Sequence, residues 1–577
     1  MRRSSFSSSP ARAWSGSGLG SGGDAVPRSA RGLAVRSAIC NLQCAVCNGP
    51  RPSPIGLGGL ACVLLLSALL LPVACRRNEE PTQPEGGGTL TIASREPTSI
   101  DPAFFVAGQD FEIASNVHEG LFTWSRERAE VVPRLARRHE ASPDMIRWMF
   151  EIDTSAKYSD GTGIVAGDFV FAWMRLLDPA TAAAGADALF LIQGARDFAA
   201  GKGGRPAIEA PDDRTLVVTL EHPQPFFPEL LASPRFAPLP RHAFGDPGKD
   251  LYSMPHPVSC GAYRLESWDR RQRMVLVPNP HHPDASRLRR PRVEILFSES
   301  EETGLNWFSS GRVDLVYGLV PISRISELRG RLGEELVFFP MRSVSYFIFN
   351  LHRPPLDNRA VRLALHAAID RRRIVEDVLG AGQDEAWSFI PPLYESAIGY
   401  RPHQCPRPRL PDAFLLPEPV RQAASGLELS CNSSETLKAM LETTQHTLRE
   451  RLGIHLAVRL LEWQTFISSL RQGDFAVARL SLSGGPDPLD FLENFTTGHP
   501  NNYSGFSMPE YDGAVARARA EGDPERRKEA MDVAHSLLCE HLPATPVYSS
   551  TQVYLVRKSL LPDFQPNPEG IYLWKDL

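Results

Sequence analysis

Short apolar segments with two different periods alternate along most of this chain. "TLTIAS" (89–94), "TLVVTLE" (215–221) and "FAVARLSL" (475–482) are short and rich in β-branched or apolar residues, which is typical of strands. "AGDFVFAWMRLLD" (166–178) and "SSETLKAMLETTQHTLRERLG" (433–453) instead repeat apolar residues every three to four positions, as one buried helix face requires. Because the two kinds of segment alternate irregularly, the sequence predicts an α/β protein.

Two further segments are predicted to be helices, over 358–380 and 525–542. In the helix over 433–453, Ser433 or Ser434 is a candidate N-cap, and Gly453 is the expected C-terminal stop. There is no internal repeat of the length that solenoids or propellers require.

Composition excludes several classes of protein. The chain has 577 residues, of which 42% are hydrophobic and 22% charged, as in an ordinary globular protein. Its formal net charge is −5, with acids and bases interspersed, so nothing favours nucleic acid as a partner.

The N-terminal segment indicates export. A Ser-, Gly- and Arg-rich low-complexity extension (1–54) precedes "IGLGGLACVLLLSALLLPVAC" (55–75), an uncharged run that ends in a lipobox-like "LPVAC". The sequence predicts a lipoprotein signal with lipidation at Cys75; the alternative is an uncleaved membrane-anchoring helix. A charged, Pro- and Gly-containing tether (76–88) follows. Both alternatives place the remaining chain outside the cytoplasm, tethered to a membrane.

The cysteines leave their pairing open. Cys40, Cys44 and Cys47 have a spacing seen at iron–sulfur sites, but they lie before the predicted cleavage point, so we predict no cofactor there. An exported protein with four further cysteines permits three pairings. We expect a short loop closed by Cys405 and Cys431 first, and the alternative is that Cys260, Cys405, Cys431 and Cys539 are all buried free thiols.

Several segments occur in the order found in one family. "LARRHEASPDMIRWMFEIDTSAKYSDGTGIVAGDFVFAWMRLLDP" (135–179) resembles the extracytoplasmic solute-binding proteins of ABC importers, family 5, and most closely the oligopeptide-binding lipoproteins. "GAYRLESW" (261–268), "FSSGRVDLV" (308–316), "LGIHLAVRLLEWQTF" (452–466) and the stretch 511–548 continue the resemblance to the C-terminus. Each segment alone has an ordinary structural explanation, but their common order does not.

The resemblance implies a two-lobed periplasmic-binding-protein-like fold with an extra appended domain. Lobe one would be discontinuous, with the appended domain inserted in it and lobe two following. The implied ranges are 86–128, 235–343 and 543–577 for lobe one, 129–234 for the appended domain and 344–542 for lobe two. A peptide would lie between the lobes as an added strand, held mainly by main-chain hydrogen bonds.

The resemblance also implies ligand-binding residues. "SVSYFIFNL" (343–351) and "VARLSLSG" (477–484) match the two strands that pair with the ligand backbone, and Arg479 matches an arginine able to bind a peptide carboxylate. Trp463 matches a ligand-lining aromatic residue, and the alternative is that it is a core residue. The full expected set is Ser345, Tyr346, Phe347, Trp463, Arg479, Ser481, Ser483, Gly484, Gly485, Asp487 and Asp110.

One departure from the family pattern concerns the ligand's α-ammonium group. Where oligopeptide-binding relatives carry an aspartate for this group, the chain has Gly484 or Gly485, and Leu482 replaces an aromatic residue. Burying an ammonium without a carboxylate costs several kcal/mol. Asp487, or else Asp110, is therefore expected to replace the missing acid. A ligand-contacting tyrosine is also replaced, by Gly185.

Catalytic and metal motifs are lacking. "HHPD" (281–284) has two adjacent histidines, which rarely face one metal, and no nucleophile elbow or phosphate-binding loop is present. The sequence therefore predicts a monomeric binding protein with an ABC permease and ATPase as partners, and not an enzyme. A non-peptide ligand (a metal complex, haem or a sugar) and a non-transport sensor or chaperone role are the alternatives.

Overall fold

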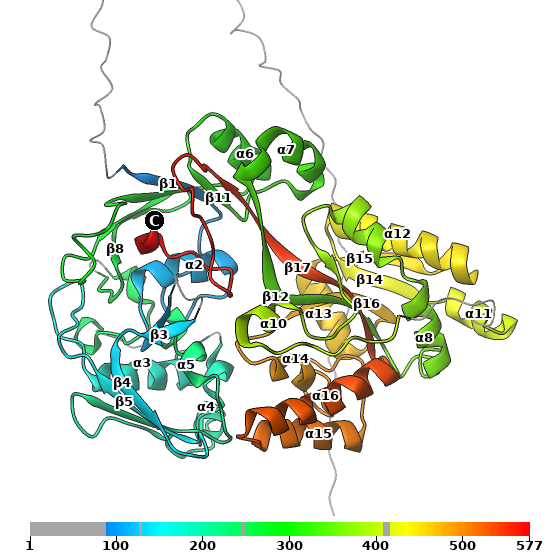
Figure 1. Ribbon diagram of the computed structural model, residues 1–577, viewed down its shortest axis with the longest axis horizontal. Helices are drawn as coiled ribbons and strands as arrows, with labels where there is room; N and C mark the ends of the chain where they lie inside the picture. Colours follow the sequence, from blue (N-terminus) through cyan, green and yellow to red (C-terminus); the bar gives the residue numbers. More distant parts are fainter. Residues whose placement is uncertain are drawn as a thin grey trace, which may run out of the picture. The chain divides into compact units, whose positions relative to one another are not determined.

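The computed structural model describes residues 88–125, 130–183, 185–244, 246, 248–254, 257–407 and 416–577 (Figure 1). The predicted extension, lipoprotein signal, Cys75 and all but the last residue of the tether lie outside these ranges. Within them, no helix combines the length and the apolar character that crossing a membrane needs.

The fold is built on a mixed sheet of eleven strands, in the order β15-β14-β16-β12-β17-β11-β1-β10-β9-β8, with β13 beside β17. The strands are β1 (Leu90–Ser94), β8 (Tyr263–Asp269), β9 (Arg273–Pro278), β10 (Val293–Phe297), β11 (Leu315–Tyr317), β12 (Leu336–Phe349), β13 (Asp384–Glu385), β14 (Glu428–Asn432), β15 (Ala457–Leu461), β16 (Val477–Ser483) and β17 (Ala544–Val556). The predicted α/β class is confirmed.

Two long antiparallel strands, β12 and β17, join the two halves of this sheet (Figure 1). The start of β12 pairs with the end of β17 beside β11, with Leu336 opposite Leu555. The end of β12 pairs with the start of β17 beside β16, with Ile348 opposite Ala544. The register slips between Pro340 and Val344, so the connection is bulged where the chain passes from one half to the other.

A separate four-stranded antiparallel sheet lies within the range predicted for the appended domain. Its order is β4-β5-β7-β6, from Ala136–Ala141, Arg147–Ile152, Thr215–Thr219 and Ile208–Glu209. Helix α3 (Ala166–Leu177) packs its buried Phe169 and Trp173 into the same core. The domain boundaries themselves remain predictions.

Helices cover the half of the sheet that holds β14–β16. They are α8 (Arg359–Ala368), α12 (Glu435–Leu452), α13 (Trp463–Gln472), α14 (Leu489–Glu493), α15 (Pro509–Ala520) and α16 (Pro524–His541). Helix α12 ends as predicted at Gly453, which has a left-handed φ of 65°. Ser434 occupies the N-cap position, but its side chain makes no capping hydrogen bond.

The prediction of one continuous helix over 358–380 is wrong. Helix α8 stops at Ala368, Ile369 is extended, and a π-helical turn spans Ile374–Leu379. The cause is the buried Arg371, whose guanidinium donates hydrogen bonds to the carbonyls of His366, Ala386 and Pro546. Satisfying this buried charge requires the backbone to turn out of the helix.

The expected Cys405–Cys431 pairing is also wrong. Cys405 forms a disulfide with Cys539 of α16, which is 134 residues away in the sequence. Cys260 and Cys431 are buried free thiols. Cys431 lies on β14, which the tertiary fold separates from the Cys405 loop.

Candidate functional site

Three of the predicted ligand residues, Trp463, Gly484 and Gly485, lie at one end of three parallel strands. Strands β14, β15 and β16 run in the same direction, so their carboxyl ends lie at the same edge of the sheet. Trp463 follows β15, and Gly484 and Gly485 follow β16. Ligands in open α/β sheets bind at the carboxyl ends of parallel strands.

The second half of β16 has one unpaired edge in the part of the chain that the structure describes. Strand β14 pairs with β16 only at Val477 and Ala478, whereas β12 pairs along its whole length. Gly484 N–H donates to Arg342 O (3.0 Å), so the even-numbered residues of β16 are those bonded to β12. The peptide groups of residues 479, 481 and 483 therefore point toward the open edge.

Arg479 forms the centre of a polar cluster on one face of this strand. Its Nε donates to Ser345 Oγ (2.9 Å), and its Nη2 donates to Ser481 Oγ (2.8 Å) and to Tyr548 Oη (2.5 Å). No carboxylate forms an ion pair with Arg479 among the described residues. The three hydroxyl groups position the guanidinium without pairing its charge with an acid, so it is able to bind an anionic group of a ligand.

Strand β12 differs from its predicted role. It is flanked by β16 and β17 on its two edges, so its backbone is already paired and is not open to a ligand strand. The side chains of Tyr346 and Phe347 are fully buried in the hydrophobic cores on opposite faces of the sheet. Of the three residues predicted on β12, Ser345 alone reaches the polar cluster around Arg479.

Two glycines allow close packing at the end of β16. A β-carbon on Gly484 would lie 2.3 Å from the ring of Phe491 and 3.0 Å from Tyr394 Oη. Tyr394 Oη also donates to the carbonyl of Gly485 (2.5 Å). The glycine pair is therefore a steric requirement of the loop, which packs directly against α14 and Tyr394.

The two acids predicted to bind an ammonium group are engaged elsewhere in the fold. Asp487 is buried and pairs with the Arg527 guanidinium at 3.2 and 2.5 Å. Asp110 is fully buried and accepts hydrogen bonds from the backbone N–H groups of residues 98, 106 and 107. Both carboxylates have their acceptor positions occupied by strong donors.

Asp490 is a residue that the sequence reasoning missed. Its Oδ2 accepts a hydrogen bond from the N–H of Gly485 (2.8 Å), one of the two glycines expected to match the family's acid. Burial, with the neighbouring Asp487 carboxylate, raises the pKa of Asp490 to about 8. The sequence feature that could have identified Asp490 is its place five residues after Gly485, in the first turn of the short helix α14.

The remaining predicted residues differ in exposure. Trp463 is 48% exposed at the start of α13, which excludes its alternative role as a core residue, and Ser483 is exposed as well. Leu482 is buried in the core. Gly185 has a φ of 85°, and a β-carbon there would lie 2.7 Å from the Arg235 guanidinium.

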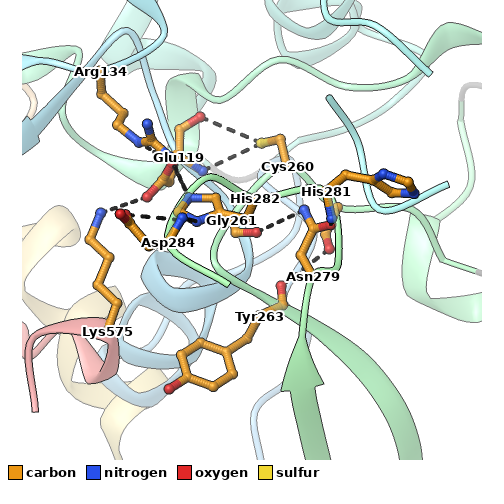
Figure 2. Close-up of polar contacts among 11 residues, drawn as sticks. Glu119, Arg134, Cys260, Gly261, Tyr263, Asn279, His281, His282, Asp284 and Lys575 are labelled. Atoms are coloured by element: carbon orange, nitrogen blue, oxygen red, sulfur yellow. Dashed lines mark hydrogen bonds and ion pairs between the residues drawn. The ribbon is translucent and has the colours of Figure 1, made fainter. Parts of the chain in front are cut away.

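The adjacent histidines of "HHPD" point apart (Figure 2). His282 is buried and its Nε2 lies 3.0 Å from Glu119 Oε2, whereas His281 is directed away from this pair. Glu119 also pairs with Arg134 (2.5 Å) and with Lys575 (2.6 Å) (Figure 2). Through Lys575, the cluster connects the C-terminal segment to Glu119. Its acidic and basic side chains pair with one another.

Comparison with known proteins agrees with this architecture. Residues 130–503 match the model of the bacterial extracellular solute-binding proteins, family 5. The chain is 29% identical over 524 residues to the periplasmic murein peptide-binding protein MppA of Escherichia coli, covering 88% of this chain and 96% of MppA. It is 30% identical over 509 residues to the periplasmic oligopeptide-binding protein OppA of Salmonella typhimurium, covering 85% and 93%.

Solved structures show the same two-lobed fold. The unliganded open form of MppA superposes with a TM-score of 0.70 at 28% identity, covering 85% of this chain and 98% of MppA. Haemophilus influenzae OppA, in complex with the peptide RPPGFSPFR, superposes with a TM-score of 0.68 at 25% identity, covering 85% and 98%. The chain therefore belongs to the bacterial extracellular solute-binding proteins of family 5, which are binding components of ABC importers and not enzymes.

Proposed function

We propose that this protein captures oligopeptides outside the cytoplasm and delivers them to an ABC permease driven by an ATPase. The observation that carries the proposal is the edge of β16 that no described strand pairs, beside Arg479, which has no carboxylate partner among the described residues. The ligand enters as an added strand against residues 479–483, and main-chain bonding makes recognition depend weakly on side chains.

Each end of this edge has a distinct chemistry. The Arg479 guanidinium, with Ser345, Ser481 and Tyr548 holding it in place, binds a peptide carboxylate. The Gly484–Gly485 loop and Ser483 lie at the other end of the strand. Trp463 offers an exposed ring for an apolar side chain.

The test is calorimetric titration of short peptides with a free or an amidated C-terminus. We expect Arg479→Gln to weaken binding of the free-carboxylate peptides by about 10–100-fold, as loss of a charged hydrogen bond of about 1.5–3 kcal/mol implies. Amidated peptides should be affected far less. Arg471→Gln is the matched control, because Arg471 is exposed on α13.

The outcomes separate two parts of the proposal. If peptides of no length bind the wild-type protein, the peptide assignment is wrong. If Arg479→Gln weakens free and amidated peptides equally, the protein binds peptides but Arg479 does not read their carboxylate.

We also propose that the protein acts as a monomer tethered by a lipid on Cys75. The support is the lipobox-like sequence and the following tether. Cys75→Ser should abolish incorporation of labelled fatty acid and release the protein from the membrane fraction. Retention of the label in that variant would exclude this anchor.

A further inference from the structure

The loop after β16 contains a carboxyl group without a cationic partner. Asp490 lies on α14 and reaches back to Gly485, where its Oδ2 accepts the backbone N–H at 2.8 Å. No described lysine, arginine or histidine forms an ion pair with it; Arg527 of α16 (Pro524–His541) is bonded to Asp487 instead. The second oxygen of Asp490 therefore retains acceptor capacity.

Gly485 is the residue that lets this carboxyl group take its position. A β-carbon at Gly485 would lie 2.8 Å from Asp490 Oδ2, which is closer than such atoms approach. An acid at 485 and the present position of Asp490 thus exclude one another. The carboxyl oxygen of Asp490 occupies the space into which a side chain at 485 would project.

This position is at the end of the unpaired edge of β16. Residue 483 is the last whose peptide groups point to that edge, and Gly485 follows it by two residues. An added antiparallel strand of about six residues whose carboxylate lies near Arg479 has its amino terminus near Gly485. The Arg479 guanidinium and the Asp490 carboxyl group therefore lie at opposite ends of one open strand.

We infer that Asp490 supplies the carboxylate that binds the ligand's α-ammonium group, and that the ligands of this protein are consequently peptides with a free amino terminus. The inference rests on the proposed peptide-binding function. In this protein a residue of α14 then binds the α-ammonium group, in place of an acid at the end of the strand. Gly485 is the complementary change that makes the replacement sterically possible.

The groups that face Asp490 determine how it responds to such a ligand. They are Asp487 and Glu493 within the loop and α14, Gly485 N–H from the end of β16, Tyr394 from α10 (Leu393–Ile398), and Arg527 from α16. Burial and the two acids favour the protonated form of Asp490, and an incoming ammonium favours the ionised form. Binding should therefore expel the proton.

The first experiment measures the affinity of matched free and N-acetylated tripeptides by titration calorimetry. We expect the wild-type protein to prefer the free amine by about tenfold or more. Asp490→Asn should reduce this preference to near one. An asparagine oxygen can still accept the Gly485 N–H, so the loop should stay folded. Glu510→Gln is a control that makes the same carboxyl-to-amide change on an exposed residue.

A relocation variant makes the test sharper. Gly485→Asp in the Asp490→Ala background returns an acid to the strand. The alanine removes the one side-chain atom that a β-carbon at 485 would meet, and the backbone at 485 is not in the left-handed region, so it accepts a side chain. We expect the preference for the free amine to return. Failure of the double variant to recover a preference that the single variant lost would overturn the inference.

The second experiment follows the proton directly. At pH 6.5, in buffers of different ionisation enthalpy, binding of the free-amine peptide should release about one proton per site, since the amine is already protonated. Neither the N-acetylated peptide nor Asp490→Asn should release it.

The outcomes distinguish this inference from the function on which it rests. Equal affinity for free and acetylated peptides in the wild-type protein, or an unchanged preference in Asp490→Asn, overturns the role of Asp490 and leaves peptide binding intact. Absence of binding by every peptide overturns both.

Discussion

The guanidinium of Arg527 donates to both carboxylate oxygens of Asp487, at 3.2 and 2.5 Å, and both side chains are buried. Arg527 belongs to α16 and Asp487 to the loop that follows β16. The ion pair thus anchors the candidate ligand loop to a long helix. It also takes Asp487 out of the set of acids able to meet a ligand.

Breaking this ion pair should be costly. Arg527→Ala leaves the Asp487 carboxylate buried and unpaired, so we expect the free energy of unfolding to fall by about 3–5 kcal/mol in urea titrations. Arg526→Ala, at an exposed neighbouring position with surface ion pairs, should cost under about 1 kcal/mol. Similar losses in the free energy of unfolding for the two variants would show that the buried ion pair stabilises the fold no more than the surface ion pairs do.

The glycine at the end of β16 should be sensitive to a single methyl group. Gly484→Ala forces the Phe491 ring to move, and we expect a loss of about 1–3 kcal/mol in thermal or urea unfolding. Gly330→Ala is the control, because Gly330 lies within α7 (Ile325–Leu332) with open space around it. That substitution should be neutral or stabilise by up to about 1 kcal/mol. A harmless Gly484→Ala would mean that the loop repacks freely.

The disulfide should be both detectable and stabilising. Alkylation of the unfolded, unreduced protein should leave Cys405 and Cys539 unlabelled and joined in one pair of proteolytic peptides, while Cys260 and Cys431 are labelled. Replacing Cys405 and Cys539 together by serine should lower the free energy of unfolding by about 2–5 kcal/mol. Recovery of a peptide that joins Cys405 to Cys431 would contradict the structure.

Stability should fall as pH rises from about 5 to 8, partly through Glu112 on α2 (Gly108–Val117). Burial raises the pKa of Glu112 to about 8, above its value in the unfolded chain. The stabilisation from its protonated form is complete below about pH 4.5 and is lost as pH rises through about 8.

The variant Glu112→Gln should lose this component of the pH dependence. The amide stays neutral and its oxygen can still accept the Tyr572 N–H bond. Urea unfolding at pH 5, 6.5 and 8 should show a smaller decline in the variant than in the wild type, and Glu435→Gln, at an exposed position, should leave the decline unchanged. A decline of the same size in Glu112→Gln would assign it to other groups, such as Asp490.

Local patterns in the sequence predicted several of the longer secondary-structure elements. The strand over 475–482 appears as β16, and the helices over 166–178, 433–453 and 525–542 appear within one or two residues of their predicted ends. Hydrophobic period and caps act over a few residues, so they can be read from the chain. The helix over 358–380 failed because Arg371 takes its hydrogen-bond partners from distant residues such as Ala386 and Pro546.

The candidate site was predicted only in outline. Arg479 and Gly485 were selected by resemblance, but Tyr548, which helps to hold Arg479, comes from a strand that is distant in sequence. Asp487 was selected because it is the nearest carboxylate to the glycine pair along the chain, and Asp490 was missed. In the structure Arg527 of α16 pairs with Asp487, whereas Asp490 accepts the N–H of Gly485.

The sequence by itself determined the class of the fold, the positions of its main elements and the family resemblance, because each rests on residue order and short-range periodicity. Only the tertiary structure decided which cysteines pair and which edge of β16 is open. It also decided which of the two described aspartates after β16, Asp487 or Asp490, forms an ion pair with a basic side chain. Those properties depend on contacts between residues tens to hundreds of positions apart, and such contacts form only when the strands and helices have packed.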